Sequence, residues 1–100
     1  MAEQTLTVVA RVQAKTEKLS QVEEMLTGLV APTRQEPGCI GYVLHRSPED
    51  PCSFLFVEKW RSQADLDEHL QKPYLQALIN QADALLSGPL DVTMWHEVAP

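Results

Sequence analysis

The sequence is poor in the residues that mark several common classes of protein. It holds only 2 cysteines and 4 glycines in 100 residues. The cysteines form no Cys-x-x-Cys motif and have no histidine at metal-ligand spacing, so no zinc-site pattern is present. The glycines form no glycine-rich loop of the kind that cradles a phosphate or a dinucleotide. We therefore expect neither a bound metal nor a flavin or other cofactor.

Basic residues are scarce as well. The chain has 8 lysines and arginines against 14 aspartates and glutamates, which gives a net charge of −6. This balance argues against nucleic acid and anionic membrane surfaces as partners. No apolar run approaches the ~18 residues of a membrane-spanning helix, and the opening MAEQTLTVVARV lacks the pattern of a signal peptide. We expect a cytoplasmic protein.

The two cysteines are expected to be free thiols. Cys39 and Cys52 fall at opposite ends of a predicted hairpin. Seven residues at ~3.3 Å each separate such positions by roughly 23 Å, which is too far for a disulfide. We expect Cys39 to be buried.

The pattern of apolar residues predicts one domain over residues 1–100. A content of 44% hydrophobic and 22% charged residues is that of a globular chain. Alternating residues predict strands, and three- to four-residue spacing predicts helices. The predicted strands are 6–12, 39–46, 53–60 and 90–98; the predicted helices begin near Thr16, after Ser62 and at Pro73, and the last one ends at Gly88-Pro89.

The resulting order is β-α-β-β-α-(α)-β. Right-handed crossovers place both helical layers on the same face of one antiparallel four-stranded sheet. The predicted fold is therefore α+β and ferredoxin-like, with strand order 4-1-3-2.

The third predicted strand is apolar on both faces. Phe54 and Phe56 lie on one face, and Leu55 and Val57 on the other. Because helices can cover only one face, the other would be an apolar patch of the kind that marks an interface. We therefore expect a homodimer in which two sheets stack face to face.

Polar residues gather where the third strand gives way to the next helix. Glu58 and Trp60 share a face with Phe56, and His69 falls on the apolar side of the helix that follows. If that strand face meets the helices, His69 approaches Glu58 and Trp60. The indole of Trp60 offers a flat surface against which an aromatic ligand can pack. A carboxylate that is hydrogen-bonded to the His69 imidazole would make the imidazole a stronger base.

Four segments in this order resemble the antibiotic biosynthesis monooxygenase family of small dimeric α+β barrel proteins. The segments are LTVVARV, EPGCIGY, FLFVEKW and DEHLQKPYLQAL. Together they cover nearly the whole chain and are most similar to the quinol-monooxygenase-like bacterial branch. The resemblance implies a cofactor-independent oxygenase that uses molecular oxygen on quinols or polycyclic aromatic phenols.

On this reading His69 and Glu58 are the candidate catalytic residues. Trp60, Tyr74, Phe56 and Leu78 are the candidate substrate-binding residues. A structural interpretation stays open for each polar member: Glu58 and His69 can be a buried pair that joins helix to sheet, and Trp60 and Tyr74 can be packing residues.

Other activities in the family leave further alternatives. The pattern associated with haem-degrading members of the family is an Asn on the first strand, a Trp on the third strand and a His ligand on the later helix. Here only Trp60 matches, and the ligand position falls near Leu78 or Ile79, so haem degradation is not expected. A non-catalytic binding or stress-associated dimer and an isomerase of a small phosphorylated sugar remain open.

Overall fold

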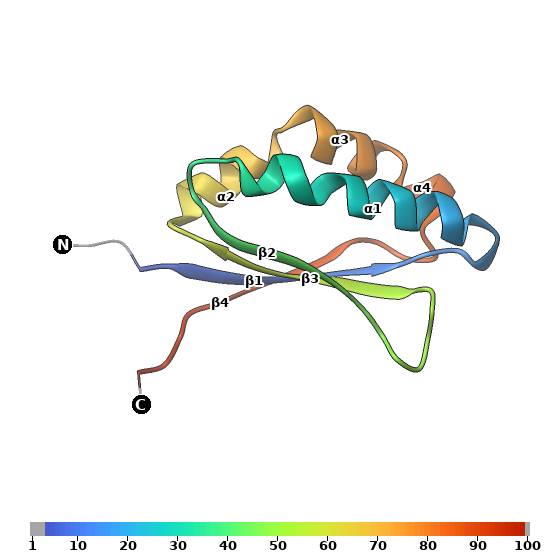
Figure 1. The fold of residues 1–100 in the computed structure, drawn as a ribbon, viewed down its shortest axis with the longest axis horizontal. Coiled ribbons are helices and arrows are strands. Elements are labelled where there is room, and N and C mark those ends of the chain that lie inside the picture. The colour runs from blue at the N-terminus through green and yellow to red at the C-terminus, as the bar shows by residue number, and fades with distance from the viewer. Residues whose placement is uncertain (1–3, 100) are drawn as a thin grey trace.

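The computed structural model describes residues 4–99 as a sheet covered by helices on one side (Figure 1). In chain order the elements are β1 (Leu6–Gln13), a 3₁₀ turn η1 (Thr16–Lys18), α1 (Leu19–Arg34), β2 (Cys39–Arg46), β3 (Ser53–Trp60), α2 (Gln63–Leu70), α3 (Pro73–Asn80), α4 (Ala82–Leu85) and β4 (Asp91–Trp95). No helix among residues 4–99 is long and apolar enough to cross a bilayer.

The four strands form one antiparallel sheet in the order β2-β3-β1-β4. This is the predicted order read from the other edge, so the ferredoxin-like α+β fold is confirmed. The two central strands, β1 and β3, are paired along their full length, from Leu6 opposite Trp60 to Gln13 opposite Ser53. The face of β3 that carries Glu58 therefore lies beside the helix-facing side of β1.

Alternation along the strands separates a buried face from an open one. On β3, Phe54, Phe56, Glu58 and Trp60 are buried beneath the helices, as predicted for the helix-facing side. The same alternation on β1 buries every second residue from Leu6 to Val12. These side chains pack against the apolar faces of α1, α2 and α3 and form a single core.

No helix within residues 4–99 covers the opposite face of the sheet (Figure 1). Val9, Val57 and Val43 are directly opposite one another on three adjacent strands and form an apolar row across this face. Val43 and Val57 are 45% and 39% exposed, and Trp95 on the neighbouring edge strand is 58% exposed. This open apolar face matches the one expected from the sequence.

Three details differ from the sequence prediction. The last helix does not run unbroken to Gly88: α3 ends at Asn80, and the short α4 ends at Leu85 because Leu86 joins Ala14 in a β-bridge. β4 is shorter than the predicted 90–98 and pairs with β1 alone. Cys39 is half-buried, and it is Cys52 that is buried; both are free thiols.

The loop between α1 and β2 packs closely on the start of α2. Ser62 caps α2 as predicted, with its hydroxyl accepting from the Asp65 amide, and Asp65 also accepts from the Arg61 guanidinium. A Cβ on Gly38 would lie 2.2 Å from Cγ of Asp65. Gly38 is therefore required by space alone, since no described glycine has a positive φ.

Gly38→Ala should destabilise the protein by about 1–3 kcal/mol, the usual cost of overpacking a closely fitted site. The Asp65 side chain cannot yield freely because Arg61 and Ser62 hold it. Gly28→Ala is the matched control: Gly28 lies on the exposed side of α1 with nothing near its Cβ position, so alanine should stabilise by roughly 0.5–1 kcal/mol. Denaturant unfolding of both variants measures the difference, and equal effects would contradict this account.

Candidate active site

A cavity of about 270 Å³ lies between the helix-facing side of the sheet and helices α2 and α3. Three of its lining residues carry polar side-chain atoms: Tyr42, Glu58 and His69. The rest of the lining is apolar and is made by Val8, Ala10, Val12, Phe56, Leu66, Leu70, Leu75, Leu78, Ile79, Leu90 and Val92. An apolar hollow with few convergent polar groups is the usual form of a small-molecule site.

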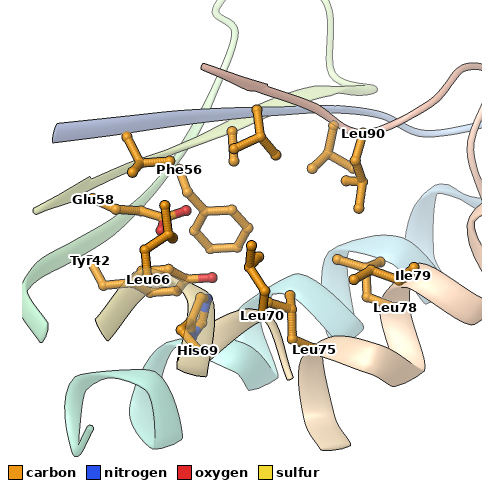
Figure 2. Close-up of a pocket in the computed structure, with 14 residues that line it drawn as sticks. Tyr42, Phe56, Glu58, Leu66, His69, Leu70, Leu75, Leu78, Ile79 and Leu90 are labelled. Carbon is orange, nitrogen blue, oxygen red and sulfur yellow. The ribbon is translucent and has the colours of Figure 1, made fainter. Parts of the chain in front are cut away.

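The polar side chains gather at one end of this cavity. Figure 2 shows Glu58, Tyr42 and His69 around the Phe56 ring, whereas Ile79 and Leu90 lie at the far end. Ile79 and Val92 are 38% and 41% exposed, although both line the cavity. The cavity thus has a closed polar end and an apolar end that reaches the surface between α3 and β4.

Glu58 is a carboxylate buried in the core, with 4% of its surface exposed. Its Oε1 accepts a hydrogen bond from Trp60 Nε1 at 2.8 Å. Burial raises the pKa of Glu58 from an ordinary 4.5 to about 7, the Trp60 hydrogen bond opposes that rise, and the negative charge of Glu36 adds to it. Glu58 can therefore gain and lose a proton near neutral pH.

His69 is 2% exposed and lies among aromatic rings. Its ring centroid is 4.6 Å from that of Trp60 and 5.6 Å from that of Tyr42. The close approach of His69 to Trp60 is as expected, and Glu58 and His69 line the same cavity.

The hydrogen bond expected between Glu58 and His69 does not form. His69 Nδ1 is instead 2.8 Å from Oε2 of Glu36, and the Tyr74 hydroxyl donates to the same oxygen. The carboxylate beside the imidazole is therefore Glu36, from the loop after α1. The physical reason is that Glu58 and Trp60 are neighbours on one face of β3, so the indole N–H satisfies the Glu58 oxygen that faces it.

Tyr42 brings a second aromatic ring and a hydroxyl to the polar end. Its ring stacks on Phe56 with centroids 4.6 Å apart, and the register of the sheet places it directly opposite Glu58. Burial, and then the Glu58 charge, raise the pKa of Tyr42 above its ordinary value. Tyr42 therefore keeps its proton and can serve as a hydrogen-bond donor.

The residues predicted from the sequence take different places around the cavity. Phe56 and Leu78 line it, as do Glu58 and His69. Trp60 is fully buried behind Glu58 and His69 and does not line the cavity, and Tyr74 is held against Glu36 outside it. Trp60 thus contacts two of the lining residues, whereas Tyr74 is linked to the lining residue His69 only through Glu36.

Two residues at the site were not predicted. Glu36 looked like part of a helix-ending EPGC turn, and only a contact across 33 residues reveals its partner His69. Tyr42 carried a usable signal: it lies on the inner face of β2 if that strand pairs with β3 in register. Within residues 4–99, no group of three or more His, Cys, Asp and Glu side chains is arranged to hold a metal ion.

The arrangement has two chemical capacities. Aromatic and aliphatic walls fit a flat apolar ligand. The carboxylate of Glu58 and the imidazole of His69 can exchange protons with a hydroxyl group at the closed end. Proton transfer to an aromatic hydroxyl is the reaction step to which these groups are best suited.

Comparisons of the sequence with a family model and with known proteins indicate the same family. The family model "Antibiotic biosynthesis monooxygenase" matches residues 5–81. "Putative monooxygenase Rv0793" of Mycobacterium tuberculosis is 34% identical over 87 residues, which cover 87% of this chain and 85% of that protein. An uncharacterised Synechocystis protein, sll1783, is 31% identical over 94% of this chain, which spans only 64% of that relative's length.

Solved structures share the fold along nearly the whole chain. PA3566 from Pseudomonas aeruginosa superposes with a TM-score of 0.91 at 29% identity, covering 99% of both chains. The structure of Rv0793 gives a TM-score of 0.88 at 29% identity and covers 96% of this chain and 97% of that one. The predicted resemblance is confirmed: this chain belongs to the antibiotic biosynthesis monooxygenase family.

Proposed function

We propose that the protein is a cofactor-independent monooxygenase of quinol-like or polycyclic aromatic phenols. The observation that carries this proposal is the buried carboxylate of Glu58, with a pKa near 7, at the closed end of an apolar cavity. A group that takes up protons near the working pH is what general base catalysis requires. The monooxygenase names of relatives from Mycobacterium tuberculosis and Bacillus subtilis agree with an oxygenase class.

The proposed reaction needs no electron donor besides the substrate. Loss of a phenolic proton to the site gives an electron-rich phenolate, which transfers electrons to molecular oxygen. One oxygen atom becomes bonded to a ring carbon and the other leaves as water, which takes up two substrate hydrogens. The substrate is oxidised by four electrons and oxygen is reduced by four, so quinol and oxygen give hydroxyquinone and water.

Glu58 and His69 are the residues proposed to handle protons. Both reach the cavity at its closed end, where a bound phenol would place its hydroxyl if its ring packed against Phe56. Trp60 donates to Glu58 and packs on His69, so its proposed role is to hold both groups rather than to contact substrate. Phe56 and Leu78 would form part of the apolar wall around the substrate ring.

The cavity lining also bears on the alternative functions. It contains no lysine or arginine, and a sugar phosphate would need such cations at the bound phosphate. Leu78 and Ile79 line the cavity where haem-degrading relatives would need an iron ligand, and neither side chain can bind iron. A dimer that binds an aromatic compound without turnover uses the same cavity, and only an activity measurement separates it from the proposed enzyme.

Oxygen consumption with a panel of menadiol- and anthrone-like compounds tests the proposed activity. We expect the wild-type protein to exceed the uncatalysed rate with at least one compound. His69→Ala should lower the turnover of that compound by roughly 10²-fold or more, as for a lost proton-transfer group. His96→Ala, which removes an exposed histidine outside the cavity lining, is the control. No turnover by the wild-type protein across the panel would favour the non-catalytic alternative.

Glu58→Gln should change how stability depends on pH. The folded-state pKa of Glu58 lies above its ordinary value, so its favourable contribution is complete below pH 4.5 and is lost as the pH rises through about 7. Glutamine keeps an acceptor for Trp60 and cannot ionise. Between pH 5 and 8 the variant should therefore gain roughly 2–3 kcal/mol in unfolding free energy relative to the wild type.

Denaturant unfolding of both proteins at the two pH values, at equal protein concentration, measures this gain. A stability difference that stays the same at pH 5 and pH 8 would show that Glu58 titrates in its ordinary range. In turnover, the rise in kcat/KM through about pH 7 should be missing from Glu58→Gln if Glu58 is the base.

We further propose that two copies of this chain pair through the open face of the sheet. The support is the apolar row of Val9, Val43 and Val57 and the exposed Trp95 on the same face. A second copy presents the same row, and two stacked sheets would remove both from water.

Val57→Asp should separate the dimer, because a carboxylate buried without a partner costs several kcal/mol. Val57 is 39% exposed in the single chain, so the subunit itself should still fold. Gln21→Asp, on the exposed side of α1, is the control and should leave assembly unchanged. Sedimentation equilibrium should give twice the chain mass of 11.2 kDa for the wild type at micromolar concentration. A wild-type protein that sediments at the mass of one chain would refute the pairing.

A further inference from the structure

We infer that Glu36 is the positioning residue of this site: it fixes His69 in the Nδ1–H tautomer, so that Nε2 is the nitrogen offered to the cavity as proton acceptor. The inference rests on the proposed function for its role in turnover. The sequence pattern did not indicate Glu36, because it paired His69 with Glu58.

The first support is the hydrogen bonding around Oε2 of Glu36. The Tyr74 hydroxyl donates to this oxygen, and His69 Nδ1 lies 2.8 Å from it. An oxygen that already accepts from Tyr74 is best suited to accept from the imidazole as well. Nδ1 then carries the hydrogen, because the partner of one ring nitrogen decides which of the two is protonated.

The second support is the direction in which the imidazole faces. His69 lines the apolar cavity, but Glu36 does not. Glu36 lines a separate polar pocket of about 140 Å³. The two ring nitrogens lie on different sides of the imidazole, so a ring that points Nδ1 at Glu36 turns Nε2 away from it. No described residue forms a hydrogen bond with Nε2.

The third support is the rigidity of the loop that holds Glu36. Its amide donates to the Thr33 carbonyl at 3.0 Å, and its carbonyl accepts from the Cys39 amide at 3.0 Å. Two residues after Glu36, the Gly38 carbonyl accepts from the Arg61 amide at 2.9 Å. A loop fixed at three points to α1, β2 and the start of α2 can hold a carboxylate in one geometry, which is what orientation of a catalytic group demands.

Other charged groups near Glu36 do not replace it. The polar pocket is also lined by four charged residues that do not line the cavity, namely Arg61, Asp65, Glu68 and Lys72. Among the described residues, the hydrogen bonds at the His69 ring include only one carboxylate, that of Glu36; the Lys72 amide donates to the His69 backbone carbonyl and not to the imidazole. Glu68 is exposed, and its carboxylate lies in the same polar pocket as Glu36. Glu68→Ala is therefore a matched control that removes a carboxylate from this pocket without touching the imidazole.

Nitrogen NMR of protein labelled with ¹⁵N-histidine tests the tautomer directly, and it does not require turnover. In slightly alkaline buffer the wild-type His69 should show a protonated Nδ1 and an unprotonated Nε2. Glu36→Ala should populate the Nε2–H tautomer that free imidazole side chains prefer. Glu68→Ala should match the wild type. An Nε2–H tautomer in the wild type, or an unchanged Nδ1–H tautomer in Glu36→Ala, overturns the inference.

Kinetics of the same variants test the consequence for the reaction. Glu36→Ala should lower kcat at least tenfold, a part of the 10²–10⁴ that a positioned base supplies. KM should change less than twofold, because Glu36 does not contact the cavity. Turnover per folded protein that is unchanged in Glu36→Ala, despite a switched tautomer, overturns the positioning role. If the wild type turns over no compound in the panel, the proposed function fails, and the tautomer measurement still decides what Glu36 does.

Glu36→Gln carries the test if the alanine variant does not fold. Its amide oxygen can still accept from Nδ1–H, so the tautomer should be retained and kcat should fall less than in the alanine variant. Loss of the Nδ1–H tautomer together with wild-type kcat in Glu36→Gln would overturn the inference.

Discussion

The site depends on one hydrogen bond inside the core, from the Trp60 indole to the Glu58 carboxylate. Both residues lie on the same face of β3, two positions apart, and both are almost completely removed from water. A carboxylate in such surroundings pays a large desolvation cost, which a single neutral donor offsets only in part. The outcome is a group whose pKa is raised to about 7 and that faces an apolar cavity. Without the indole, Glu58 would have no described partner for its charge.

The architecture explains why this group sits where it does. Helices cover one face of the sheet, so every second residue of β1 and β3 is buried beneath them. α2 is fixed to the loop before β2 by the close contact of Gly38 with Asp65, and this brings His69 and Glu36 together at the closed end. The two carboxylates thus lie in different settings: Glu58 lines the cavity together with His69, and Glu36 is bonded to the imidazole and lines a polar pocket. Pairs of titratable groups in contrasting environments are typical of sites that move protons.

The fold was largely predictable because its signals are local. Alternation along Ser53–Trp60 and helical spacing along 19–30 fixed the elements, and the crossover rule fixed the strand order. The site was predictable only in part. Glu58 and His69 were found because strand and helix periodicity put them on inward faces, whereas Glu36 lies in a loop with no periodicity, 33 residues from its partner. The end of the helical region at Leu85 was also missed, because it follows from a tertiary contact of Leu86 with Ala14 rather than from the Gly88-Pro89 breaker.

The central claim is that Glu58 exchanges its proton near neutral pH, and the titration of its own carboxyl carbon tests that claim most directly. Protein labelled with ¹³C-glutamate, with the Glu58 resonance assigned by its absence in Glu58→Gln, can be followed by NMR across the pH range in which the fold persists. The account predicts a single Glu58 transition with a midpoint near pH 7. A midpoint between about 4 and 5, the ordinary range for glutamate, would contradict it.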